Sequence, residues 1–162
     1  MRIVSLLAAI TLTGFAISVN AAYDEELGSA KLHDLDNSIK HHSGNILAIK
    51  QGLLTQAPTN QRNVKDVEYS DDVLSVLSEI SIESETLIEH QSLFGKMGSE
   101  HGKTSANARV IDDVRILKDK CGPYLDEINL NLNKIKSDDL VFEVKNARDD
   151  AVKICGIIQR WE

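Results

Sequence analysis

The chain has 162 residues and a formal net charge of −7; 42% of the residues are hydrophobic, 4% are aromatic, and there are nine glycines and two cysteines. This length is typical of one domain, and the hydrophobic fraction is too high for a disordered chain. The few aromatic residues and glycines disfavour an all-β sandwich or barrel, and the acidic charge disfavours nucleic acid as a partner, because phosphate binding needs clustered cations.

The first 21 residues have the pattern of a secretory signal. Arg2 is the only charged residue before Asp24, an apolar stretch follows it, and Val19-Asn20-Ala21 suits a cleavage site after Ala21. A retained membrane anchor is the alternative, which the short and interrupted apolar run disfavours. We expect residues 1–21 to be removed and residues 22–162 to form one domain without a transmembrane anchor. This domain is expected to be extracellular or in the cell wall, or periplasmic if the source is a Gram-negative bacterium.

Four segments carry apolar residues at the three- and four-residue spacings of amphipathic helices. The first is predicted over about Asp24–Leu54, and segment 55–69 is expected to be the only long loop. The second is predicted to begin at Ser70-Asp71-Asp72, a Ser cap followed by two acids at the positive end of the helix dipole. Its predicted core-facing positions are Val73, Leu77, Ile80, Ser84, Leu87, Gln91 and Phe94.

Thr104 is the predicted cap of the third helix, which contains Gly122-Pro123. We expect a kink there, because proline removes one backbone donor and clashes with the preceding turn; a full break would give five helices. The fourth helix is predicted to begin at Ser137-Asp138-Asp139, after a turn so short that helices three and four must be antiparallel neighbours. The predicted fold is therefore an all-α, up-down antiparallel four-helix bundle. The core-facing positions of the third helix are Ile111, Val114, Lys118, Cys121, Leu125, Ile128, Leu132 and Ile135, and those of the fourth are Leu140, Val144, Ala147, Ala151, Ile154, Ile158 and Trp161.

Cys121 and Cys155 are expected to form a disulfide. An even number of cysteines in a secreted chain suggests pairing. The two residues lie 16 positions before and 18 positions after Ser137. Folding the chain at this turn therefore brings both to the same height, about 24–27 Å from the turn.

No motif for catalysis or for a cofactor withstands inspection. Segment Gly98–Thr104 resembles a phosphate-binding loop, but it has three residues between its glycines instead of four and follows a helix rather than a strand. The histidines include no i,i+4 pair and no Glu-x-x-His, so a zinc site would need His41 or His42 together with His90 or His101 from another helix. We expect a protein that is not an enzyme and holds no metal, haem or other cofactor.

Apolar residues exceed what one core-facing stripe on each helix requires. Ile82, Ile116 and Leu130 are expected to face outward. They are either ordinary scattered surface residues or part of a protein that meets a hydrophobic ligand, between its helices or on an exposed face. The candidate lining of a ligand site between the helices is Ile39, Ile46, Ile80, Leu87, Leu125, Ile128, Leu132, Ile154 and Ile158.

A series of positions over about residues 29–161 supports a resemblance to a known family. These positions are Asp34-Leu35-Asp36-x-x-Ile39, Gly44, Leu117-Lys118, Leu125, Leu132-x-Lys134, Asp139-Leu140-Val141, Ala147, Ala151 and Ile158. In this order the chain resembles the hydrophobic surface binding protein A family of secreted fungal proteins, which includes cell-wall galactomannoproteins. The resemblance implies an extracellular helical bundle that adsorbs to hydrophobic surfaces or binds lipids without catalysis. The chain departs from the family in its sparse alanine, in Asn45 after Gly44 instead of a second glycine, and in its cysteine pair.

We therefore expect a secreted, disulfide-linked helical bundle that binds hydrophobic surfaces or lipids. The alternative is a bacterial periplasmic protein-interaction module, such as an inhibitor or an immunity-type partner. A metal or haem carrier is the third class. Because aromatic residues are scarce, contacts with a ligand are expected to be mainly aliphatic.

Overall fold

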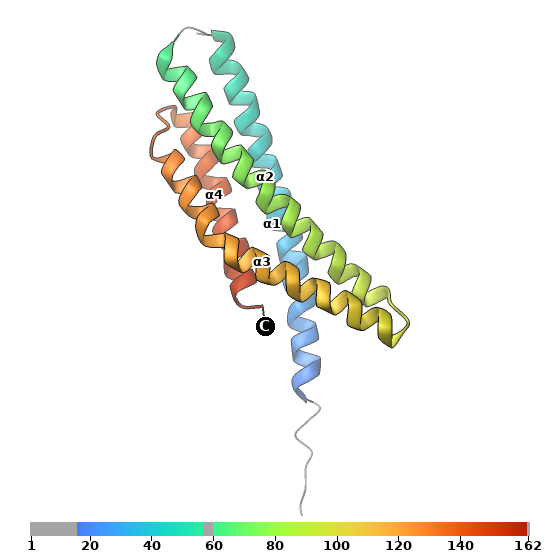
Figure 1. Cartoon of the computed structure of the whole chain (residues 1–162). Helices are drawn as coiled ribbons and strands as arrows, with labels where there is room; N and C mark the ends of the chain where they lie inside the picture. Colours follow the sequence, from blue (N-terminus) through green and yellow to red (C-terminus); the bar gives the residue numbers. More distant parts are fainter. Residues whose placement is uncertain (1–15, 57–59, 162) are drawn as a thin grey trace, which may run out of the picture.

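The computed structural model describes residues 16–56 and 60–161, with the side chains from residue 29 onward except those of residues 95, 100 and 101. The described chain forms four helices, α1 (Ala16–Gln56), α2 (Gln61–Lys96), α3 (Glu100–Leu132) and α4 (Asp138–Gln159) (Figure 1). Each helix runs antiparallel to the next, and α1 also packs along α4, which closes the bundle. The predicted all-α, up-down four-helix bundle is confirmed.

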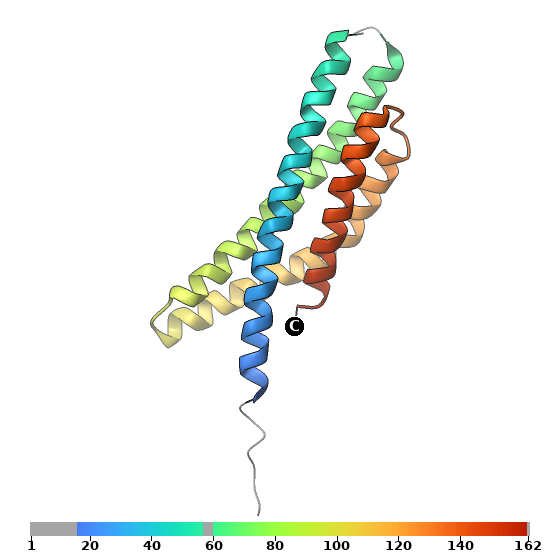
Figure 2. The ribbon, with the colours of Figure 1, turned by 180° about the vertical axis from the view of Figure 1, so that it is seen from behind.

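The four helices do not stay together along their whole length. Figures 1 and 2 show that the end of α1, the start of α2 and the α3–α4 turn lie at one end of the bundle, whereas at the other end the α2–α3 hairpin leans away from α1. The Nζ of Lys118, near the middle of α3, donates to the carbonyl oxygen of Trp161 at 2.5 Å, so α4 ends well before the α2–α3 turn. The last turns of α2 and the first turns of α3, residues 90–111, therefore form a two-helix projection, which we call the hairpin tip.

The core follows the predicted apolar stripes wherever all four helices are present. In α4 every predicted core-facing position from Leu140 to Trp161 is buried. Phe94 and Ile111 are the exceptions in α2 and α3, because they lie in the hairpin tip, where they are 41% and 59% exposed. Ile82 and Leu130 are exposed as predicted, whereas Ile116 is only partly exposed.

The start of α2 differs most from the expectation, because the helix begins at Gln61 instead of Ser70. The side chain of Asn60 caps it by accepting a hydrogen bond from the backbone N–H of Arg62 at 3.0 Å. Ser70 is buried inside the helix, where its hydroxyl donates to the carbonyl oxygen of Val67 at 2.8 Å. A serine hydroxyl can donate a hydrogen bond to a backbone carbonyl oxygen of the preceding helical turn. A Ser-Asp-Asp pattern therefore does not by itself identify a helix start.

The cap of α3 is Ser99 rather than Thr104. Its side chain accepts from the backbone N–H of Gly102 at 3.1 Å, which is the arrangement of an N-cap residue and its N3 position. A Cβ atom on Gly102 would lie 2.8 Å from the sulfur of Met97, so a larger residue here would displace that exposed side chain. The glycine-rich segment that resembles a phosphate-binding loop thus serves to start a helix.

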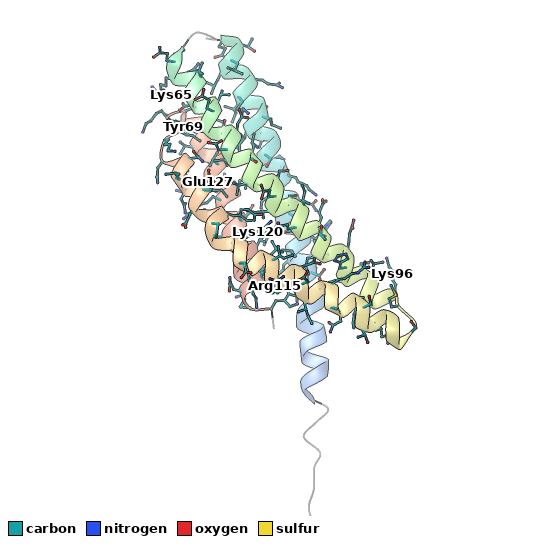
Figure 3. All side chains as sticks on the ribbon, viewed as in Figure 1. Lys65, Tyr69, Lys96, Arg115, Lys120 and Glu127 are labelled. Carbon is teal, nitrogen blue, oxygen red and sulfur yellow. A yellow bond between two sulfur atoms is a disulfide. The ribbon has the colours of Figure 1, made fainter. Side chains whose placement is uncertain are left out.

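The α3 helix is continuous through Gly122-Pro123, so the structure has four helices rather than five. Figure 1 shows that α3 changes direction near its middle, and Figure 3 places Lys120 close to this bend. A bend is expected about one turn before a proline, because the proline ring clashes with the carbonyl group of the residue four positions earlier. The predicted disulfide between Cys121 and Cys155 is present, and it joins α3 to α4 with the two Cα atoms 5.7 Å apart.

The predicted signal segment falls largely outside the described residues. Positions 1–15 are not described, and positions 16–21 belong to α1, which begins at Ala16 rather than near Asp24. No proline interrupts the chain between these two positions, and alanine favours a helix strongly. Within the described ranges, no helix combines the length and the apolar character needed to cross a membrane.

Candidate functional site

The nine residues predicted to line a ligand site between the helices belong to the packed core. Seven of them are buried, and Leu125 and Leu132 are partly buried against the same cluster. Neither of the two cavities described below is lined by any of the nine. Heptad spacing therefore identified residues that pack in the core of the bundle.

The hairpin tip carries the most concentrated group of exposed apolar side chains among the described residues. Leu93 and Phe94 lie in the last turn of α2, Met97 is its C-cap residue, and Ile111 lies in the early turns of α3. Sequence periodicity placed Phe94 and Ile111 in the core, because the apolar stripes continue past the point where α1 and α4 cover them. The exposure of these residues thus results from the way in which the hairpin leaves the bundle.

A groove of about 250 Å³ runs between α2 and α3 in this tip. Leu93 and Met97 form one wall and Ala106 lies on the other, with His90 and Arg109 at its polar edge. Positions three and four apart share a helix face, which brings Leu93 and Met97 together in α2. The groove therefore has apolar walls and a polar edge, and Phe94 and Ile111 are exposed elsewhere in the same tip.

The groove has a partnered histidine and Arg109 at its edge, and the tip also carries Lys96 and Lys103. The Nδ1 of His90 lies 2.5 Å from Oδ2 of Asp113, which links α2 to α3 at the base of the tip. Lys96, Lys103 and Arg109 are exposed, and no carboxylate among the described side chains lies within 4.0 Å of their charged groups. An apolar surface flanked by cations is typical of proteins that contact a lipid interface.

His41 and His42, which were considered for a zinc site, lie away from His90 and contact other groups or solvent. His42 contacts α4, with Nδ1 2.7 Å from Oε2 of Glu143, while His41 is exposed on α1. The side chain of His101 lies outside the described residues. In the part of the chain that the structure describes, no group of three or more His, Cys, Asp or Glu side chains is arranged to hold a metal ion.

Polar contacts inside the bundle connect α1 to both of its neighbours. The Asp36 carboxylate is fully buried; it accepts a hydrogen bond from Ser81 of α2 and lies 2.8 Å from Nζ of Lys40. The hydroxyl of Ser38 donates to Asp150 of α4 at 2.6 Å. The hydrogen bond from Lys40 to Asp36 is the main reason that the pKa of Lys40 is raised. These contacts were not predicted from the sequence, because the apolar stripe gives no information on polar residues beside it.

Tyr124 forms the corresponding polar link between α3 and α2. Its hydroxyl donates to Oε2 of Glu79 at 2.8 Å and lies 3.2 Å from Oε1 of Glu83, which also pairs with Lys120. Burial, followed by the hydrogen bond to Glu79, raises the pKa of Tyr124 to about 12. Loss of the phenol proton would leave a buried anion next to two carboxylates.

Alkaline titration tests this arrangement. Because the pKa of Tyr124 is raised from 10.0 in the unfolded chain to about 12 in the fold, its contribution to stability is complete below pH 10 and is lost as the pH rises through about 12. Phenolate absorbance at 295 nm should show a component that ionises near pH 12, and Tyr124→Phe should remove this component. Ionisation of all tyrosines near pH 10 in the folded protein would contradict the assignment.

Three comparisons with known proteins return no match: no protein-family model, no curated protein and no solved structure is detectably similar to this chain.

Proposed function

We propose that this protein is a secreted, non-catalytic helical bundle that binds hydrophobic surfaces or lipids through its hairpin tip. The observation that carries the proposal is the exposure of Leu93, Phe94 and Met97 where the α2–α3 hairpin leaves the bundle. The secretory pattern of residues 1–21 and the Cys121–Cys155 disulfide support export. The resemblance to the hydrophobic surface binding protein A family favours the same kind of ligand.

A surface mode of binding suits this molecule better than a ligand between the helices. The interior positions are filled by side chains, and opening them would separate α3 from α4 against the disulfide. The tip, in contrast, offers partly exposed side chains without rearrangement. Complete burial of a Leu or Phe side chain contributes about 1.5–3 kcal/mol, so two that are already half-buried would contribute about 2 kcal/mol together.

The cations at the edge of the tip give this binding a second component. Lys96, Lys103 and Arg109 would approach the interface together with the apolar side chains. Each cation near an anionic membrane surface contributes about 1 kcal/mol, and this contribution falls with salt. Binding to neutral surfaces would therefore depend on the apolar side chains, and binding to anionic surfaces would also depend on ionic strength.

A pair of matched double variants tests the role of the tip. Leu93→Ser with Phe94→Ser removes one leucine and one phenylalanine that are each 41% exposed. Leu130→Ser with Phe142→Ser removes the same two residue types at sites that are 55% and 63% exposed, away from the tip. We expect the tip variant to bind phosphatidylcholine vesicles at least tenfold more weakly than wild type, and the control to bind within about twofold.

Vesicle flotation and retention on a hydrophobic resin give the two readouts, with circular dichroism as a check on folding. Equal loss of binding by the two variants would show that exposed apolar area anywhere on the surface suffices, which contradicts a site at the tip. Absence of wild-type binding to both vesicles and resin would contradict the proposed function itself.

A further inference from the structure

A second cavity lies at the end of the bundle opposite the hairpin tip. It has a volume of about 580 Å³ and is formed by the first turns of α2 and the α3–α4 turn. Figure 3 shows Lys65 and Tyr69 at this end of α2 and Lys96 at the other. Four of the side chains that line the cavity are cations, Arg62, Lys65, Lys134 and Lys136. Such a cluster is unexpected in a chain with a net charge of −7.

The four cations of the cavity, like Lys96, Lys103 and Arg109 of the hairpin tip, have no acidic partner among the described side chains, and all four line one cavity. No described carboxylate oxygen lies within 4.0 Å of the charged group of any of the four. Six cations elsewhere do have such a partner, namely Lys40, Lys50, Arg115, Lys120, Arg148 and Lys153. The charge at the cavity is therefore left uncompensated by the neighbouring side chains.

Hydrogen bonds across the cavity hold its walls in place. Nη2 of Arg62 donates to the carbonyl oxygen of Lys136 at 2.6 Å, and the backbone N–H of Lys136 donates to Oδ1 of Asp66 at 2.9 Å. Nζ of Lys134 lies 5.1 Å from the centre of the Tyr69 ring, a cation–π contact that joins the α3–α4 turn to α2. The backbone of Lys136 is thus fixed on both sides, while its side chain and that of Lys65 have no described partner.

We propose that this cavity is a binding site for a phosphate group, carried by a soluble molecule or by a lipid headgroup. The lining carries four positive charges against one carboxylate, that of Asp66, and Asp66 is 2% exposed and already accepts a backbone hydrogen bond. A phosphate monoester, with a charge of about −1.5 to −2 at pH 7, compensates this excess better than a single carboxylate does. The cavity volume is within the range of small-molecule sites, about 300–1,000 Å³.

The two ends of the molecule then have different ligand chemistry. The first turn of α2, which contributes Arg62, adds the partial positive charge of a helix N-terminus to that of the side chains. The hairpin tip offers apolar side chains, and α2 runs from one site to the other. The phosphate site does not depend on the binding of hydrophobic surfaces by the tip.

Binding to pyrophosphate and to phosphatidic acid vesicles tests the proposal on the full chain. Lys65→Gln with Lys136→Gln removes two cavity cations whose side chains hold no other described group. Lys31→Gln with Lys145→Gln makes the same change of net charge at exposed positions outside both the cavity and the hairpin tip. We expect saturable binding with one site per chain, weakened at least tenfold in the cavity variant and unchanged within about twofold in the control.

Each outcome of this experiment supports or overturns the proposal. Binding of soluble pyrophosphate that the cavity variant loses would identify a free phosphate compound as the ligand. Binding to phosphatidic acid vesicles but not to pyrophosphate, again weakened in the cavity variant and not in the control, would identify a lipid headgroup. Equal loss of binding by the two variants would show that binding depends only on net charge, and this result would overturn the proposed site. Failure of both probes, or binding of poly-glutamate in their place, would also overturn it. The cavity variant should still bind phosphatidylcholine vesicles through the hairpin tip. This measurement distinguishes a failure of the phosphate site from a failure of the proposed function.

Discussion

Replacing Cys121 and Cys155 together by alanine lowers the free energy of unfolding by about 4 kcal/mol, the expected effect of removing a cross-link from a loop of this size. The disulfide links residues that are 34 positions apart and joins α3 to α4, the least extensive of the four interfaces between neighbouring helices. Its loss gives the unfolded chain more conformations while leaving the packing of the other helices intact. Urea unfolding of the oxidised wild type and the double variant measures the difference.

Two controls separate the cross-link from its surroundings. Both cysteines are buried, so Cys121→Ser with Cys155→Ser would add two hydroxyls to the core and should be less stable than the alanine pair. Reduced wild type should resemble the alanine variant. A difference below 1 kcal/mol between oxidised wild type and the alanine variant would contradict the expectation, as would free thiols in the unfolded, unreduced protein.

The second large effect is expected at Ile80, where substitution by alanine should cost about 2–5 kcal/mol. Ile80 is 1% exposed in the centre of α2, and truncating it leaves a cavity in the core. Ile82, two residues later in the same helix, is 58% exposed and provides the control. Ile82→Ala removes the same atoms and brings the same gain in helix propensity, so its effect should stay within about 0.5 kcal/mol.

Urea unfolding of the two isoleucine variants measures this comparison directly. The slopes of the transitions should agree with that of wild type, so that the midpoints report stability alone. If Ile80→Ala does not fold, Ile80→Val should still cost about 0.5–1.5 kcal/mol. Equal destabilisation by the two alanine substitutions would show that the register of α2 in the bundle is wrong.

Periodicity predicted the buried side of each helix well, and helix ends less well. The α4 stripe from Leu140 to Trp161 is buried throughout, because repeated spacing over six turns leaves only one face that can be apolar. The start of α2 was misplaced by nine residues because Ser70 had two plausible roles. The cap at Asn60 depends on a single hydrogen bond to Arg62, and such a weak local signal is easily overlooked.

Candidate sites were less accessible to sequence reasoning. The nine residues chosen as ligand lining are core residues, because spacing shows that a position is buried but not whether space remains beside it. The cationic cavity was missed, because Arg62 and Lys136 are 74 positions apart and the overall charge of −7 conceals a local cluster. The exposed tip was missed for a similar reason, since Phe94 and Ile111 continue stripes that are buried elsewhere.

The amino-acid sequence by itself determined the helical class, the apolar faces and the pairing of Cys121 with Cys155. The first two follow from the spacing of apolar residues within each helix, and the third follows from the distances of the two cysteines from one turn. Only the tertiary structure decided where the helices part and which charged side chains converge. Both depend on the relative lengths and directions of helices, and on contacts between residues far apart in the chain. The two proposed binding sites lie where the bundle ends, and local sequence patterns do not show where the ends of different helices meet.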